Sequence, residues 1–179
     1  MADASHFEPL IGHCTCKAVQ YQILAPPLVV NCCHCTYCQR ETGTAFAINI
    51  MIETSYLKLT GQTQPEIIKT PSLSGKGQFI ERCPSCHVAV NSHYGDSGTA
   101  LSFVRAGTLV DGSRERVKPN CHIFTSTKVD WVDLKKEKER GVKVYDGYST
   151  PSEVWSESSL ERFKVFKEML EEQKKREGK

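Results

Sequence analysis

The chain has 179 residues, nine of them cysteines, and a formal net charge of +2. A chain of this length can bury a sizeable core, so it does not depend on disulfides to compensate for a small interior. The nearly balanced charges give no electrostatic basis for binding nucleic acid or a membrane surface, and neither is expected as a partner.

The N-terminal residues contain acidic side chains and no apolar segment of the kind that forms a secretory signal. The sequence also has no run of about 18 apolar residues, the length that a spanning helix needs. We therefore expect a cytoplasmic protein. In that reducing compartment clustered thiols are more often metal ligands than disulfide partners, and an odd number of cysteines does not fit a complete set of disulfides.

The first two thirds of the chain predict a mostly β fold. Residues 18–23 alternate apolar and polar side chains, as a half-buried strand does, and residues 45–52 form a longer apolar run. Further short segments of strand character, separated by turn residues, cover 56–59, 66–69, 77–82, 87–90 and 100–110. Many short strands at close spacing predict a β-sandwich-like domain of short antiparallel strands, or an open barrel.

The composition then changes, so we assign residues 1–131 to the β domain and residues 132–179 to a charged loop and a C-terminal helix. Ser158 and Glu161 fit a capping box, which predicts an amphipathic helix over residues 159–176. We expect this helix to pack on its own domain, and a partner-binding helix is the alternative. Its apolar residues recur at helical spacing, at Leu160, Phe163, Phe166, Met169 and Leu170.

The nine cysteines fall into groups by their spacing. One pair has the spacing C-x-C, a second pair forms C-P-S-C, three cysteines form C-x-C-x-x-C, and two are left over. In this order the groups are Cys14 and Cys16; Cys83 and Cys86; Cys33, Cys35 and Cys38; and Cys32 and Cys121.

These groups suit two different zinc sites. A closed set of four thiolates is structural, whereas three protein ligands with an open fourth position are the catalytic arrangement. The two pairs supply a closed site that joins distant parts of the chain and contributes directly to folding. The triad Cys33, Cys35 and Cys38 leaves a fourth position for a water, an imidazole or a substrate thiol. We therefore predict two zinc ions per chain, one structural and one catalytic.

Other uses of these groups stay open. Cys35 and Cys38 have the spacing of a thioredoxin-like redox pair, although that motif belongs in a βαβ setting. The Cys83–Cys86 pair is also able to join the triad, which would leave the first pair without partners.

Three further residues near or beyond the cysteine groups are ambiguous. His34 lies between two ligands of the triad, and it either coordinates or faces outward to hydrogen-bond. Cys121 is either a distant fourth ligand or a small buried apolar residue, and burial is favoured. Cys32 has no assigned role.

Five blocks of sequence follow one another in a recognisable order, with Trp131 beyond the last. They are GHCTCKAVQY (12–21), CHCTYCQRETGTAF (33–46), FIERCPSC (79–86), RAGTLVDG (105–112) and PNCHI (119–123). Together they resemble the glutathione-dependent formaldehyde-activating enzyme family, which also includes centromere protein V-like members. A single C-x-x-C is a weak signal, but five ordered blocks are a strong one.

The resemblance implies a mostly β fold built around zinc, and the same division of the cysteines. By resemblance, the structural zinc is held by Cys14, Cys16, Cys83 and Cys86, and the second zinc by Cys33, Cys35 and Cys38. It also implies an enzyme that joins glutathione to formaldehyde, giving S-(hydroxymethyl)glutathione; the name carbon–sulfur lyase describes the reverse reaction.

The expected partners are thus a small-molecule thiol such as glutathione and an aldehyde, or a related glutathione conjugate, and a homo-oligomer stays open. The alternative function is a non-catalytic zinc-stabilised binding module. The fourth coordination position distinguishes the two, because an additional protein ligand there would close the second site.

Three positions depart from the family pattern. Lys17 and His87 stand where a glycine usually follows the cysteine pairs, and glycine there would relieve a turn of positive φ. Gln39 stands where a basic residue is common, although the following Arg40 is kept.

The remaining candidates are single residues. His122 is the first candidate for proton transfer, because histidine suits that role; the alternative is a histidine bonded to backbone at a strand end. Asp111 either orients a donor or ends a turn, and the turn is favoured. Arg40 and Arg105 either hold a carboxylate of glutathione or lie at the solvated surface, which is favoured for each.

Overall fold

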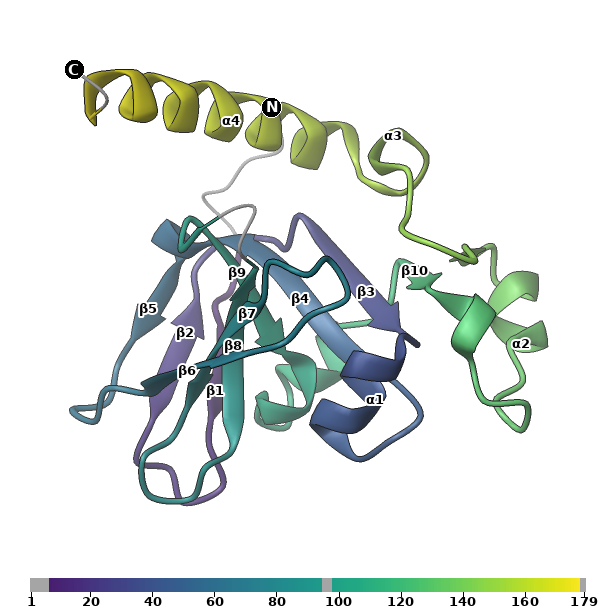
Figure 1. Ribbon diagram of the computed structural model, residues 1–179, viewed down its shortest axis with the longest axis horizontal. Coiled ribbons are helices and arrows are strands. Elements are labelled where there is room, and N and C mark those ends of the chain that lie inside the picture. Colours follow the sequence, from purple (N-terminus) through teal and green to yellow (C-terminus); the bar gives the residue numbers. More distant parts are fainter. Residues whose placement is uncertain (1–6, 95–97, 178–179) are drawn as a thin grey trace.

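The computed structural model describes residues 7–94 and 98–177, which fold into three small sheets and one long C-terminal helix (Figure 1). The first sheet has the strand order β1 (Leu10–His13), β2 (Gln20–Ile23) and β5 (Leu57–Leu59). The second, central sheet has the order β11 (Lys143–Val144), β10 (Cys121–Ile123), β3 (Val29–Cys33), β4 (Ala47–Glu53) and β9 (Leu101–Arg105). The third has the order β6 (Glu66–Thr70), β7 (Gln78–Arg82) and β8 (Ala89–Tyr94).

The prediction of a mostly β fold with short antiparallel strands is confirmed, with one addition. The pairs within the first and third sheets are antiparallel, as are β3–β4 and β4–β9. However, β10 runs parallel to β3, and β11 runs parallel to β10. The segment that carries β10 returns after a long connection, which is the arrangement that parallel pairing requires.

The strand expected over residues 100–110 is shorter than its apolar run. It ends at Arg105, because Ala106–Thr108 form one turn of 3-10 helix that redirects the chain. Leu109 then pairs with Gly12 across a single bridge, so this segment meets the first sheet instead of extending the central one.

Both faces of the central sheet are covered, and all five residues of β3 are buried. Side chains alternate between the two faces along a strand. Val30 and Ile50 therefore belong to a first core, which lies against β1 and β2. Val29, Cys33 and Met51 belong to a second core on the opposite face. This alternation decides which functional side chains meet.

The first core depends on a glycine. Gly12 pairs with Tyr21 across the β1–β2 ladder, and a Cβ on Gly12 would lie 2.2 Å from Cζ of the tyrosine ring. Tyr21 is almost wholly buried, and its hydroxyl lies 2.6 Å from Oγ1 of Thr108. The absence of a side chain at Gly12 therefore makes the space for the largest residue of this core.

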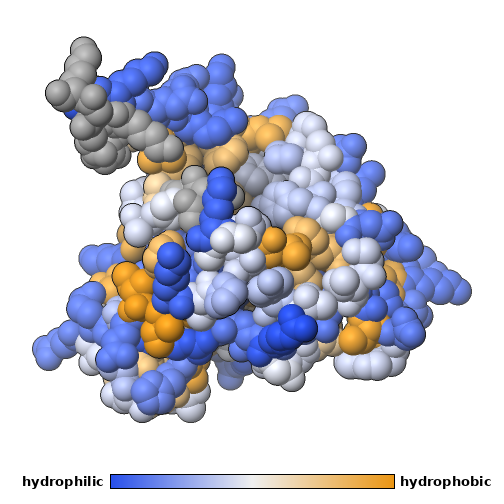
Figure 2. Space-filling model, in the orientation of Figure 1, coloured by the Kyte–Doolittle hydropathy of each residue, from blue (hydrophilic) through white to orange (hydrophobic). Residues whose placement is uncertain are grey.

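The second core is closed by α3 (Pro151–Val154) and α4 (Glu157–Glu177). The buried ring of Trp155 meets Phe163 edge to face, with centroids 4.9 Å apart. Leu160 and Phe166 pack against the same cluster. In Figure 1 the helix crosses above the sheets, and in Figure 2 its outer side is hydrophilic. The helix thus packs against the second core through its apolar face.

The start of α4 differs from the prediction. The helix begins at Glu157, and Oγ of Ser156 accepts a hydrogen bond from the Ser159 amide at 3.1 Å. Ser156 is therefore the capping residue, and the capping box assigned to Ser158 and Glu161 is wrong. Among the described residues, no helix is both long enough and apolar enough to cross a membrane.

Candidate metal centres and the adjoining cavity

The first cluster of thiols joins the β1–β2 turn to the end of β7. Its four sulfur atoms lie within 4.8 Å of one another. Cys14 Sγ lies 3.5 Å from Cys16 Sγ, which in turn lies 3.6 Å from Cys83 Sγ. These separations are too long for a disulfide, and all nine cysteines, which lie within the described ranges, are free thiols. The members are Cys14, Cys16, Cys83 and Cys86.

The two halves of this cluster are built alike. The amide of Lys17 donates to the carbonyl of Cys14 at 3.0 Å, and the amide of His87 donates to that of Cys83 at 2.9 Å. Lys17 and His87 have φ angles of 62° and 58°, the left-handed region that favours glycine. The two departures from the family pattern therefore keep the turn, at a cost in backbone strain of about 1–2 kcal/mol each.

Backbone groups favour the thiolate form of Cys86 in this cluster. Hydrogen bonds from the backbone of Cys16 and Val88 lower the pKa of the Cys86 thiol to about 6. The thiolate is the form of cysteine that binds a metal, so a lowered pKa favours binding near neutral pH. Four sulfurs from two turns, with no disulfide between them, fit a closed tetrahedral zinc site.

The second cluster lies where β3 runs into α1 (Thr36–Thr42), on the face of the central sheet that carries the second core. Its three sulfur atoms also lie within 4.8 Å of one another, and all three residues are buried. Cys35 is the N-cap of α1, and its sulfur accepts a hydrogen bond from the Cys38 amide at 3.4 Å. Hydrogen bonds from the thiols of Cys33 and Cys38 lower the pKa of the Cys35 thiol to about 2. Hydrogen bonding to Cys35 raises the pKa of the Cys33 thiol, so what suits a metal here is the convergence of the three sulfurs that the structure brings together.

A cavity of about 290 Å³ opens beside the triad. This is near the lower end of the range for small-molecule sites, roughly 300–1,000 Å³. Its walls combine aromatic rings with the side-chain amides of Asn31 and Asn49. Burial raises the pKa of Tyr94 well above its ordinary value, so its phenol stays protonated near neutral pH. Other lining residues include Tyr37, Gln78, Phe103, Ile123 and Tyr148.

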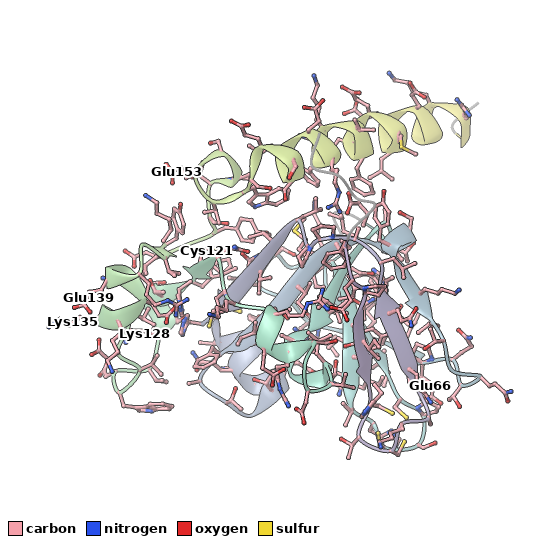
Figure 3. The ribbon with its side chains drawn as sticks, turned by 180° about the vertical axis from the view of Figure 1, so that it is seen from behind. Glu66, Cys121, Lys128, Lys135, Glu139 and Glu153 are labelled. Carbon is pink, nitrogen blue, oxygen red and sulfur yellow. The ribbon has the colours of Figure 1, made fainter. Side chains whose placement is uncertain are left out.

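Two further residues from the sequence analysis, Cys121 and Gln39, do not line this cavity, and the structure shows what each one holds. The Cys121 thiol is buried and donates a hydrogen bond to Oδ1 of Asn31 at 3.1 Å, so Cys121 supports the wall and is not among the clustered ligands. The position of Cys121 on β10 is labelled in Figure 3. Gln39, which replaces a basic residue, donates from Nε2 to the carbonyls of His34 and Thr127. It ties α1 to the segment after β10.

His122, the residue predicted for proton transfer, lies away from the triad. It pairs with Cys32 in the parallel β3–β10 ladder, whereas Ile123 pairs with Cys33. Paired residues share a face of the sheet and successive residues do not. His122 therefore lies on the face opposite Cys33, and it does not line the cavity.

His122 instead forms a third cluster with Cys32 and His34. His34 Nε2 lies 2.9 Å from His122 Nδ1 and 3.7 Å from the sulfur of Cys32. Burial, together with the charges of His122 and Lys128, lowers the pKa of His34 to about 4. His34 is thus neither a ligand of the triad nor an outward-facing side chain. Only the strand pairing, 88 residues apart in sequence, could have revealed this contact.

The remaining charged candidates divide between surface and interior. Arg40 is exposed, and Asp111 lies in an exposed turn paired with Arg114. Arg105 is buried, contrary to the surface position favoured for it, with 7% of its surface exposed. Its Nη1 donates to Oδ1 of Asn49, while Nε and Nη2 have no hydrogen-bond partner among the residues that the structure describes. Arg105 also lines a second cavity of about 480 Å³, together with Arg82 and Thr42.

One of three comparisons with known proteins agrees with the family resemblance of the sequence. The model of the family described as GFA, glutathione-dependent formaldehyde-activating enzyme, matches residues 9–127. Among solved structures, a crystal structure of a Rhodobacter sphaeroides protein is similar at 14% identity and a TM-score of 0.43, over 76% of this chain and 99% of that one. A comparison with curated proteins finds no match.

Proposed function

Because the chain belongs to the glutathione-dependent formaldehyde-activating enzyme family, we propose that it joins a thiol to an aldehyde in the cavity beside Cys33, Cys35 and Cys38. The substrates are glutathione and formaldehyde, and the product is S-(hydroxymethyl)glutathione. In the reverse direction the same site acts as a carbon–sulfur lyase. The observation that carries this proposal is the convergence of three buried thiols on the wall of a small-molecule cavity.

Two metal ions fit this scheme. A zinc ion held by the triad would lower the pKa of a substrate thiol and so supply a thiolate near neutral pH. The four-cysteine cluster would hold a structural ion that fixes the β1–β2 turn to the end of β7.

The chemical step is an addition that balances without any further reactant. The sulfur of glutathione forms a bond to the aldehyde carbon, the π bond of the carbonyl breaks, and its electron pair moves to oxygen. That oxygen then takes the proton that the thiol lost. The protein's task is to hold the two reactants together and to bring the proton to the oxygen.

Side chains of the cavity suit the developing negative charge on oxygen. The protonated phenol of Tyr94 and the amides of Asn31 and Asn49 are neutral hydrogen-bond donors in a buried wall. We assign the hydrogen bond to the new oxygen to Tyr94. His122, on the other face of the sheet, has no direct part in this proposal.

Arg105 supplies an anchor for the tripeptide. A buried guanidinium with two unpartnered nitrogens offers a carboxylate the paired donors that it prefers. Arg105 lines the second cavity while its partner Asn49 lines the first, so their hydrogen bond connects the two walls. We therefore assign a carboxylate of glutathione to the second cavity and its thiol to the first.

An exchange experiment tests this function. Zinc-loaded protein is mixed with glutathione and ¹³C-formaldehyde, and adduct exchange is followed by NMR against the uncatalysed background. Acceleration that is lost in Cys35→Ser and kept in Cys121→Ser is the expected result, because Cys121 lies outside the ligand clusters and serine keeps a donor for Asn31. No acceleration by folded, zinc-loaded protein would reject the enzyme and favour a zinc-stabilised binding module.

A further inference from the structure

The third cluster lies apart from both cysteine sites and has no part in the proposed reaction. Cys32, His34 and His122 are 2%, 0% and 6% exposed, and their ligand atoms lie within 4.8 Å of one another. Two strands that are distant in sequence bring them together, because β10 pairs in parallel with β3. The cluster is therefore fixed in the interior by strand pairing and does not depend on flexible surface side chains.

The orientation of the two rings points to a shared ligand. His34 Nε2 and His122 Nδ1 face one another at 2.9 Å, and the sulfur of Cys32 lies 3.7 Å from the first of these atoms. The other ring nitrogens, His34 Nδ1 and His122 Nε2, point away from this shared position, and neither has a hydrogen-bond partner among the described residues.

A carboxylate stands behind one of the rings. Oε2 of Glu137, on α2 (Lys135–Glu139), lies 3.8 Å from His122 Nε2. A histidine that binds a metal through one nitrogen usually donates its other N–H to a carboxylate, which fixes the tautomer and strengthens the ligand. Glu137 is placed for that role. Figure 3 labels Lys135 and Glu139 on the same helix, next to Lys128.

We propose that Cys32, His34 and His122 form a third metal site, for a divalent ion of the zinc class. One thiolate and two imidazoles are the ligands that such ions prefer. Bond lengths of about 2.0–2.3 Å place tetrahedral ligand atoms roughly 3.3–3.7 Å apart. The distance from Cys32 to His34 meets this range, and the two rings need to separate by only a few tenths of an ångström. Glu137 supports the site from behind His122, on the Nε2 side of its ring.

The site differs from the other two in what it connects. It joins the central sheet to α2, which lies beyond residue 127, where the family match ends. The thiol that it needs is Cys32, one of the two cysteines that the two-site division leaves without a role. A metal here would hold the C-terminal segment against the sheet, and it would leave the open position of the triad unaffected.

Metal counting tests the proposal on the full-length protein, independently of any activity. The chain is saturated with zinc, dialysed, and measured by mass spectrometry of the metal. We expect three equivalents for the parent protein and for Cys121→Ser, and two for Cys32→Ser. Two equivalents in the parent protein, or three in folded Cys32→Ser, would overturn the site.

A titration with cobalt gives a second test that does not depend on a core substitution. Glu137 is partly exposed and is not needed for packing, so Glu137→Gln is expected to fold. This substitution should lower the affinity for the third cobalt ion by about 10- to 100-fold and leave the affinities for the first two ions unchanged. An unchanged third binding step, or no third step in the parent protein, would contradict the proposal.

Discussion

The guanidinium of Arg105 donates a hydrogen bond to the side-chain oxygen of Asn49, its direct partner across the β4–β9 ladder. The two residues line neighbouring cavities, and Arg105 is almost fully buried with two donors left over. Burial of a guanidinium whose nitrogens are only partly hydrogen-bonded lowers the stability of the fold. This arrangement is best explained by an anionic ligand that accepts hydrogen bonds from the remaining nitrogens.

Arg105→Met should therefore raise the KM for glutathione by about tenfold or more, equivalent to ~1.4 kcal/mol of lost binding. Arg105→Lys should give an intermediate value, because lysine keeps the charge and loses the paired donors. Initial rates over a range of glutathione concentrations give the KM, and Arg114→Met, at an exposed arginine, serves as control. An unchanged KM in folded Arg105→Met would remove the carboxylate from this cavity.

The two cysteine sites should respond differently to substitution. Cys83→Ser opens the four-cysteine cluster, so it should release one zinc and unfold the domain, because that cluster joins two distant turns. Cys35→Ser should keep the fold and abolish the exchange reaction. Circular dichroism together with metal content distinguishes the two outcomes. Equal loss of structure in both variants would argue against a division into a structural and a catalytic site.

The left-handed residues at the metal turns predict a gain in stability. Lys17→Gly and His87→Gly should each raise the free energy of unfolding by about 1 kcal/mol, because glycine adopts positive φ without a steric penalty. The backbone hydrogen bonds of both turns do not depend on the side chains. Denaturant unfolding measures the change. Lys58→Gly, at an exposed strand position, should instead lower the free energy of unfolding. A lower free energy of unfolding in Lys17→Gly would contradict the argument.

A methyl group at Gly12 should be destabilising. The added Cβ would lie within 2.2 Å of the buried Tyr21 ring, so either the ring or the β1–β2 ladder has to move. Overpacking of this kind costs about 1–3 kcal/mol. The matched control is Gly107→Ala, because a Cβ there would meet no atom within 4 Å. The melting temperature of Gly12→Ala should be clearly lower than that of Gly107→Ala. Equal melting temperatures would mean that the first core accommodates the added methyl group without loss of stability.

The pair His93 and Glu81 predicts a pH dependence of stability. Burial by itself lowers the pKa of His93, but the contact with Glu81 at 2.9 Å and a hydrogen bond to the Leu101 carbonyl outweigh it, so the pKa lies above its ordinary value. A raised histidine pKa adds stability that is fully present below the unfolded value of about 6.5 and is lost as the pH rises through the folded value.

Glu81→Gln should therefore lower the melting temperature more at pH 6 than at pH 8.5. Thermal melts of both proteins at matched ionic strength measure this difference. His93→Gln in the parent background should show the same trend. A difference between parent and Glu81→Gln that grows with rising pH would reverse the sign and exclude a raised histidine pKa.

Much of the local chemistry was predictable from the sequence. The spacing of Cys33, Cys35 and Cys38 places three sulfurs on one strand-to-helix turn, and that geometry depends only on neighbours in the chain. The alternating and apolar segments predicted a mostly β fold, because the period of two follows from the strand itself. The family pattern marked Lys17 and His87 as positions where glycine would relieve a turn of positive φ, and the structure shows that both residues keep that φ without glycine.

Long-range pairing decided the rest. The register of β10 against β3 determines that His122 meets Cys32 and His34 instead of the triad, and a shift of one residue would reverse this. Burial of Arg105 likewise follows from its pairing with Asn49, which no local pattern encodes. The sequence by itself determined which residues are able to bind metal. Only the tertiary structure decided which of them share a face of the sheet, because that depends on contacts between strands far apart in the chain.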